Sequence, residues 1–140
     1  MMALAAEGRE APWTKKEDVQ EFEKLEQQLH SFLTEISELS KKKPNDPLNK
    51  FKLKFINGAL DRLNKLLGNA WPFPDFDLFD VDTLPTNSDV VVILAQYAAA
   101  AYRFRANHTE KRDYSWWWII NGKASDLKTE DPEDFNYKLK

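Results

Sequence analysis

The order of apolar and polar residues along this chain predicts three helices. In the first, apolar side chains recur every three or four residues, which places them on one face of an amphipathic helix. They are Val19, Phe22, Leu25, Leu29, Phe32, Leu33, Ile36 and Leu39. Thr14 and Glu17 have the spacing of a capping box at its start, and Pro44 follows three lysines at its end. We therefore predict a helix over residues 15–40.

A second apolar stripe predicts a helix that begins near Pro47, where a missing N–H costs nothing, with Asn45 or Asp46 as its cap. The stripe consists of Leu48, Phe51, Phe55, Ile56, Ala59, Leu60, Leu63 and Leu67. Gly68 is a natural residue to end it in a left-handed conformation. Gly58 lies within the helix and indicates the close approach of another helix. The short link to the first helix predicts an antiparallel hairpin.

The third helix is expected from about residue 87 to residue 106. Between Val90 and Tyr102 the only polar side chain is Gln96, so nearly every face is apolar, and such a helix belongs at the centre of a domain. Thr86 and Asp89 again have capping-box spacing. The β-branched run at its start also suits a buried strand, but the alanine-rich continuation favours a helix.

Two segments lack helical periodicity. Residues 71–85 contain three prolines, which disfavour a helix, together with several large aromatic residues and four aspartates. We predict an extended strap that packs its aromatic rings on the helical hairpin and keeps its carboxylates in water. Residues 110–122 are ambiguous. They suit a short fourth helix capped by Gly122, but also a strand from Tyr114 to Ile120, for which Val90–Leu94 is the available partner.

Together these elements predict an all-α fold. It is a three- to four-helix bundle with a long antiparallel N-terminal hairpin, a Pro/Phe/Asp-rich strap at 71–85 and a central apolar helix at about 87–106. The expected organisation is a flexible N-terminal tail at 1–13 and a single helical domain at 14–122. An acidic, partly ordered C-terminal tail follows at 123–140.

Composition narrows the class of protein without naming an activity. The net charge of -3 argues against a general polyanion binder. The chain has no cysteine, so it forms neither disulfides nor thiolate metal sites. Its start lacks the pattern of a signal peptide, and its longest apolar run is too short to span a bilayer. We therefore expect a cytoplasmic protein that does not interact with a membrane.

The candidate chemical motifs do not match known sites. Asp75, Asp77, Asp80 and Asp82 lack the glycine and the final glutamate of a calcium loop. Helix one carries Glu23-x-x-Glu26 and Glu35-x-x-Glu38, whose spacing occurs in metal-binding bundles. Neither histidine of the chain, His30 or His108, follows a glutamate by three residues, however. We expect no cofactor and no metal. A metal-dependent hydrolase with a helical carboxylate site is kept as the second alternative.

Nucleic-acid binding is the first alternative. Lys50, Lys52 and Lys54, with the lysine run at 41–43, are suited to phosphate contacts. Arg103, Arg105, Lys111 and Arg112 border a cluster of tryptophans, and arginines beside aromatic rings stack on single-stranded bases. The sequence pI of about 5.4 disfavours this reading, because nucleic-acid-binding domains are usually basic.

The tryptophan run Trp116-Trp117-Trp118 is the most informative local feature. No single core face accepts three consecutive large rings, because neighbouring side chains point in different directions on a helix or a strand. We therefore predict a non-enzymatic adaptor or assembly protein that self-associates as a homo-oligomer such as a dimer. Its expected partner-binding residues are Trp116, Trp117, Trp118, Arg103 and Arg105.

Overall fold

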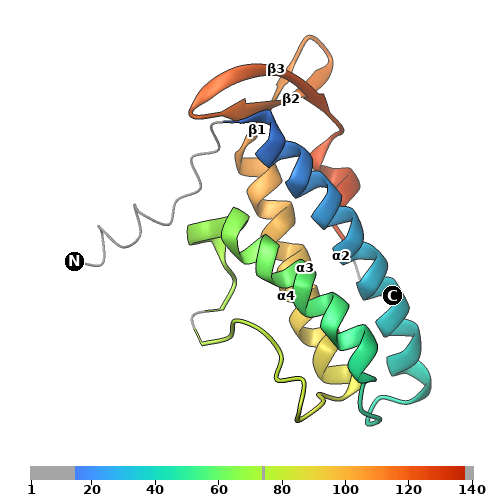
Figure 1. Cartoon of the computed structure of the whole chain (residues 1–140). Coiled ribbons are helices and arrows are strands. Elements are labelled where there is room, and N and C mark those ends of the chain that lie inside the picture. The colour runs from blue at the N-terminus through green and yellow to red at the C-terminus, as the bar shows by residue number, and fades with distance from the viewer. Residues whose placement is uncertain (1–14, 74, 138–140) are drawn as a thin grey trace.

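The computed structural model describes residues 15–73 and 75–137. Within them three long helices precede a three-stranded antiparallel sheet (Figure 1), so the prediction of an all-α bundle is wrong. The helices are α2 (Lys16–Lys42), α3 (Lys50–Leu67) and α4 (Asn87–Asn107). The strands are β1 (Thr109–Arg112), β2 (Ser115–Ile120) and β3 (Lys123–Thr129), and the short 3-10 helices are η1 (Gly68–Ala70) and η2 (Pro132–Phe135). Thr14 and the tail at 1–13 lie outside the described residues.

Two tight turns explain why residues 109–129 form a sheet. Asn121 and Gly122 join β2 to β3, and both have positive φ, of 55° and 74°. This is the backbone of a two-residue hairpin turn, for which Asn-Gly is the preferred sequence. Asp113 and Tyr114 join β1 to β2 in the same way, with φ of 54° and 66°. Gly122 is therefore a hairpin residue, and the predicted fourth helix is absent from the described part of the chain.

The strands pair with one another rather than with α4. Trp118 of β2 lies opposite Thr109 of β1, and Trp116 lies opposite Thr129 of β3. The segment Val90–Leu94, which we considered as a partner strand, belongs to α4. The sequence from residue 123 onward, expected to be a partly ordered tail, supplies β3 and η2.

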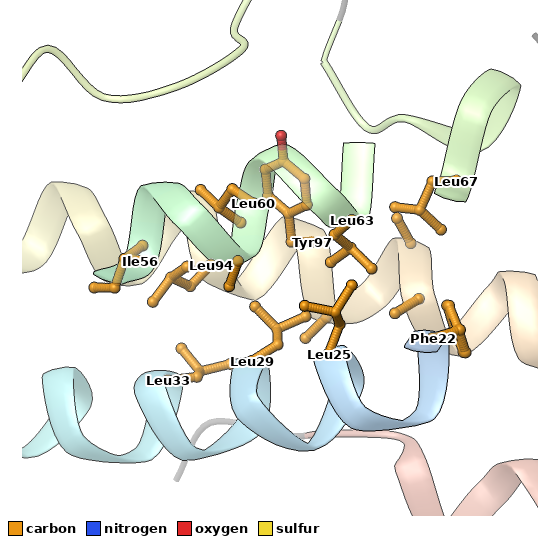
Figure 2. Close-up of a cluster of buried hydrophobic side chains, with 14 of the residues drawn as sticks. Phe22, Leu25, Leu29, Leu33, Ile56, Leu60, Leu63, Leu67, Leu94 and Tyr97 are labelled. Atoms are coloured by element: carbon orange, nitrogen blue, oxygen red, sulfur yellow. The ribbon is translucent and has the colours of Figure 1, made fainter. Parts of the chain in front are cut away.

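The hydrophobic core lies between α2, α3 and α4 (Figure 2). Leu29 and Leu33 of α2 face Leu60 and Leu63 of α3, while Leu94 of α4 lies beside them. All five side chains are almost completely buried. The predicted helical hairpin and the helical nature of residues 87–106 are confirmed. The third helix is not covered on every side, however, because Val92 and Gln96 are exposed.

The helix ends agree only partly with their predicted caps. The Thr86 hydroxyl accepts a hydrogen bond from the backbone N–H of Asp89 at 3.2 Å, as the sequence predicts. Helix α3 begins three residues later than expected. Asn49 caps it by accepting from the Lys52 N–H at 2.8 Å, while Pro47 forms an isolated bridge with Thr86. Gly68 directly follows α3 with a positive φ of 53°, as predicted, but its ψ of -114° is not that of a left-handed helical residue, and it begins η1.

The described residues of 71–85 form the predicted strap with exposed aspartates, but its aromatic rings pack on α3 and α4 rather than on the α2–α3 hairpin. The strap follows the side of α3 remote from α2 (Figure 1) and packs half-buried aromatic side chains against the core. Asn57 of α3 fixes it by bonding both the N–H and the C=O of Phe79, each at 2.9 Å. Tyr97 donates a hydrogen bond to Asn64 Oδ1 at 2.6 Å and accepts one from Trp71 Nε1 at 3.2 Å. We call residues 71–85 the acidic strap.

Candidate interaction surface

Two of the five predicted partner-binding residues are inside the protein. Trp118 is completely buried, and its indole N–H donates to Glu23 Oε2 at 3.2 Å. Arg105 is also completely buried. The structure brings these two together, with the guanidinium carbon 5.0 Å from the centre of the Trp118 ring. A partner therefore reaches neither residue on the folded protein.

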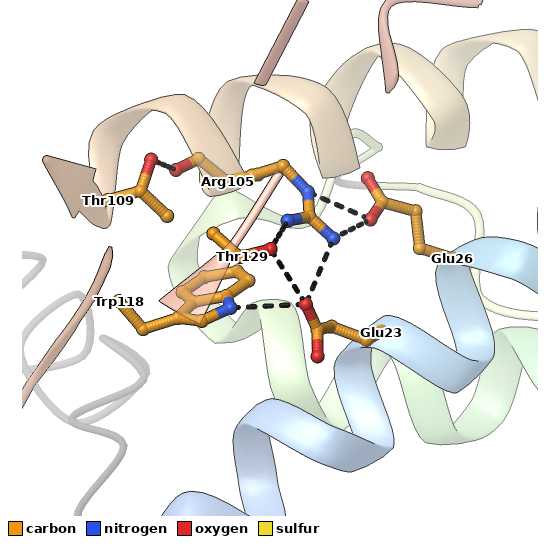
Figure 3. A network of polar contacts seen from close by, with 6 residues as sticks. All are labelled: Glu23, Glu26, Arg105, Thr109, Trp118 and Thr129. Carbon is orange, nitrogen blue, oxygen red and sulfur yellow. Dashed lines mark hydrogen bonds and ion pairs between the residues drawn. The ribbon is translucent and has the colours of Figure 1, made fainter. Parts of the chain in front are cut away.

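Arg105 connects the helices to the sheet (Figure 3). Its Nε and Nη2 donate to Glu26 Oε1 of α2 at 3.0 and 2.6 Å, and its Nη1 bonds the Thr129 hydroxyl of β3. The same hydroxyl donates to Glu23 Oε2 at 2.9 Å. Phe135 of η2 covers the guanidinium, with its ring centre 3.6 Å from the guanidinium carbon. A buried charge needs such partners because leaving water is costly. We infer that these contacts of Arg105 hold the sheet against the helices.

Burial raises the pKa of Glu26 from 4.5 to about 7, although its bonds with Arg105 act in the opposite direction. Raised pKa values often mark active sites, and Glu26 belongs to one of the glutamate pairs considered as metal ligands. Here, however, Glu26 and Glu23 both contact Arg105. In the described part of the chain no three acidic or histidine side chains are grouped as metal ligands would be.

The other three predicted site residues lie at or near the surface but not together. Trp116 is half-buried opposite Lys111 and Thr129. Trp117 is half-buried under Arg112, whose guanidinium carbon lies 4.8 Å from its ring centre. Arg103 is exposed on α4, beside Trp71 and His108. The sheet therefore offers less open aromatic surface than three consecutive tryptophans suggest.

Apart from Tyr114, which is 97% exposed in the turn between β1 and β2, the open aromatic surface is on α3. Phe51 and Phe55 are 71% and 59% exposed, and their ring centres are 5.0 Å apart in an edge-to-face contact. Gly58 and Arg62 continue the same line along the helix, at seven and eleven residues from Phe51. An added Cβ on Gly58 meets nothing within 4 Å, so the predicted close approach of another helix is wrong. We call Phe51, Lys54, Phe55, Gly58 and Arg62 the α3 outer face.

A groove between α2 and α3 adjoins this face. Its volume is about 690 Å³, and its apolar wall includes Phe32, Phe55 and Ala59. Lys24, Lys54 and Arg62 also line it, and no carboxylate does among the described residues. None of these three cations is in an ion pair within that part of the chain. The groove therefore combines an apolar wall with positive side chains that form no ion pair in the described chain.

The cations considered for nucleic-acid binding are mostly engaged elsewhere. Lys50 and Lys52 pair with Asp82 and Glu35 at 3.6 and 2.9 Å. Within the lysine run at 41–43, Lys41 pairs with Glu38 at 3.1 Å and Lys43 with Asp46 at 4.0 Å. Arg112 contacts Glu110 as well as Trp117. Lys54 instead lines the α2–α3 groove together with Lys24 and Arg62.

No family model, curated protein or solved structure matches this chain. Across the residues that the structure describes, no helix combines the length and the apolar character needed to cross a membrane.

The sequence contained a signal for the α3 outer face. Phe51 and Leu60 are nine residues apart, about two and a half helical turns, so they point to opposite sides of α3. We counted both on one apolar face. Likewise Glu26 follows Phe22 by four residues and precedes Leu29 by three, which places its carboxylate on the buried stripe of α2.

Proposed function

We propose that this protein is a non-enzymatic assembly protein that self-associates through the α3 outer face. The exposed pair Phe51 and Phe55 carries the proposal. Aromatic side chains dominate the energetics of protein interfaces, and contiguous exposed apolar surface is uncommon on monomers unless it binds something. The adjoining groove gives a partner side chain a concave site beside these rings.

This proposal moves the partner surface from the tryptophans to α3. Burial of Trp118 and Arg105 removes the centre of the surface that the sequence suggested, and Arg112 covers part of Trp117. On α3, by contrast, both phenylalanines have most of their rings in water. Exposure of this kind is costly in an isolated protein, and association relieves it.

Sedimentation velocity over a micromolar concentration series tests the proposal. We expect the wild-type protein to sediment as a concentration-dependent mixture of monomer and larger species. The double variant Phe51→Asp/Phe55→Asp should remain a monomer. The matched control is Val92→Asp, because Val92 is 59% exposed on α4, outside the α3 outer face. A wild-type protein that stays monomeric throughout, or a double variant that associates normally, contradicts the proposal.

A further inference from the structure

We infer that the acidic strap of one copy docks on the α3 outer face and the adjoining groove of a second copy. This inference rests on the proposed self-association and specifies how it occurs. Its basis is the opposite charge of two surfaces that the same chain exposes at different places.

The groove carries charge that its own chain does not neutralise. Lys24, Lys54 and Arg62 line it without an ion pair among the described residues. Lys65, also on α3, is different because it pairs with Asp61 at 3.3 Å. Two identical grooves placed face to face would oppose these cations to one another, and such like-charge contacts are unfavourable. A symmetric dimer in which groove meets groove is therefore disfavoured.

The strap has the complementary chemistry. Asp75 and Asp80 are exposed on either side of Leu78, whose side chain is itself 37% exposed. Neither aspartate is in an ion pair within the described chain, whereas Asp82 pairs with Lys50. The exposed part of the strap is thus an apolar side chain between two carboxylates that form no ion pair in the described chain, although Asp80 Oδ1 accepts a hydrogen bond from the Asp82 N–H at 2.9 Å. Leu78 suits the apolar wall of the groove, and the carboxylates suit Lys54 and Arg62.

The strap cannot occupy the groove of its own chain. Asn57 holds Phe79 of the strap through two hydrogen bonds. Asn57 follows Phe55 by two residues, which turns it about 200° around the helix from Phe55. The strap is therefore fixed on the side of α3 opposite its outer face, and the contact must form between two copies. Because the two surfaces lie on opposite sides of α3, one copy cannot offer both to the same neighbour, so the assembly is head-to-tail rather than a two-fold dimer.

Charge reversal with mixing tests this arrangement. The groove variant is Lys54→Glu/Arg62→Glu, and the strap variant is Asp75→Lys/Asp80→Lys. All four side chains are exposed, so both variants should stay folded. Asp80→Lys also removes the acceptor of the Asp82 N–H, so the strap variant should melt slightly below the wild type. We expect each variant alone to sediment as a monomer, with a dissociation constant raised about tenfold or more. An equimolar mixture should associate again, because the intact strap of the groove variant meets the intact groove of the strap variant, and the two reversed surfaces are also opposite in charge.

The outcomes separate this inference from the proposed function. If the wild type associates and both variants associate equally well alone, head-to-tail docking is wrong while self-association stands. A mixture that stays monomeric also contradicts the docking. If the wild type never associates, the proposed function fails and this inference fails with it. Added salt should weaken wild-type association, because the contact depends on exposed opposite charges.

Discussion

Arg105 Nη2 lies 2.6 Å from Glu26 Oε1, and neither side chain is accessible to solvent. The two residues are 79 positions apart in the chain, so the contact forms only when α4 packs on α2. Thr129 and Phe135 reach the same guanidinium from β3 and η2. This contact thus joins the helices and the sheet into one folded unit, and it supports the first two predictions.

Removing Arg105 should strongly destabilise the protein. Arg105→Met leaves Glu26 buried without its counter-charge, which should cost about 3 to 5 kcal/mol of unfolding free energy. Combining it with Glu26→Leu replaces the pair by apolar side chains and should recover a large part of that loss. Urea denaturation of the wild type, both single variants and the double variant measures the coupling. Additive effects of the two substitutions contradict a direct buried pair.

Glu26 should make stability depend on pH. Burial raises its pKa from 4.5 to about 7, so the folded protein holds this proton more tightly than the unfolded chain does. Its contribution to stability is therefore complete below pH 4.5 and is lost as the pH rises through about 7.

The measurement is the unfolding free energy of Glu26→Gln relative to wild type across this range. Glutamine does not titrate, so the unfolding free energy of the variant should increase relative to that of the wild type as the pH rises. The comparison is needed because burial lowers the pKa of nearby His30, whose contribution is instead lost as the pH falls. A variant whose unfolding free energy decreases relative to that of the wild type with rising pH contradicts the prediction.

Leu94→Asp should unfold the protein. Leu94 is completely buried between the helices, and an unpaired carboxylate there costs several kcal/mol, a large part of the stability of a typical domain. Val92→Asp is the control, because Val92 lies two residues away on the same helix and is exposed. Circular dichroism melting compares the two. Near-wild-type melting of Leu94→Asp would mean that α4 does not lie in the core.

Deleting residues 124–140 should also destabilise the protein. The deletion removes most of β3, takes the Thr129 hydroxyl from Arg105 and removes the ring of Phe135 that covers its guanidinium. A loose tail, by contrast, would cost little stability when removed, and the sequence predicted a partly ordered tail at 123–140. Chemical denaturation of the truncated protein distinguishes the two expectations. Unchanged stability would mean that the Arg105 network does not depend on β3 and η2.

Gly58→Ala should stabilise the isolated protein by about 1 kcal/mol, because glycine is unfavourable within a helix. An alanine Cβ meets no neighbour there. Thermal melting at low protein concentration measures the gain. A loss of stability would indicate that something packs on Gly58 within the same chain.

The helices could be predicted from the sequence because periodic apolar residues record which side of each helix is covered. Thr86, which caps α4, and Gly68, which ends α3, also act through local geometry. The sheet was not predicted because the strands that pair with Trp116–Trp118 are short and polar. The main sequence signal for a hairpin is the pair Asn121-Gly122. Gly122, interpreted as a helix cap, is the second residue of that turn, and Asn-Gly is the preferred sequence for a two-residue hairpin turn.

The candidate interaction surface was harder to predict, because it depends on which side chains remain exposed after the helices have packed. Phe51 and Ile56 are both large and apolar, but only Ile56 faces α2 and α4. The burial of Arg105 depends on Glu26 and Thr129, which are distant in sequence, and residue type alone suggests an exposed arginine. Long-range packing therefore decided which of the predicted residues could reach a partner.

Crosslinking between single-cysteine variants tests the central claim most directly, because the natural chain has no cysteine. Leu78→Cys marks the strap, Gly58→Cys marks the α3 outer face, and Val92→Cys is a control. With a short bismaleimide, we predict a covalent dimer when the strap and face variants are mixed, and little product from either alone or from the control mixtures. The absence of a mixed dimer, or equal crosslinking of each variant to itself, would contradict docking of the strap on the α3 outer face.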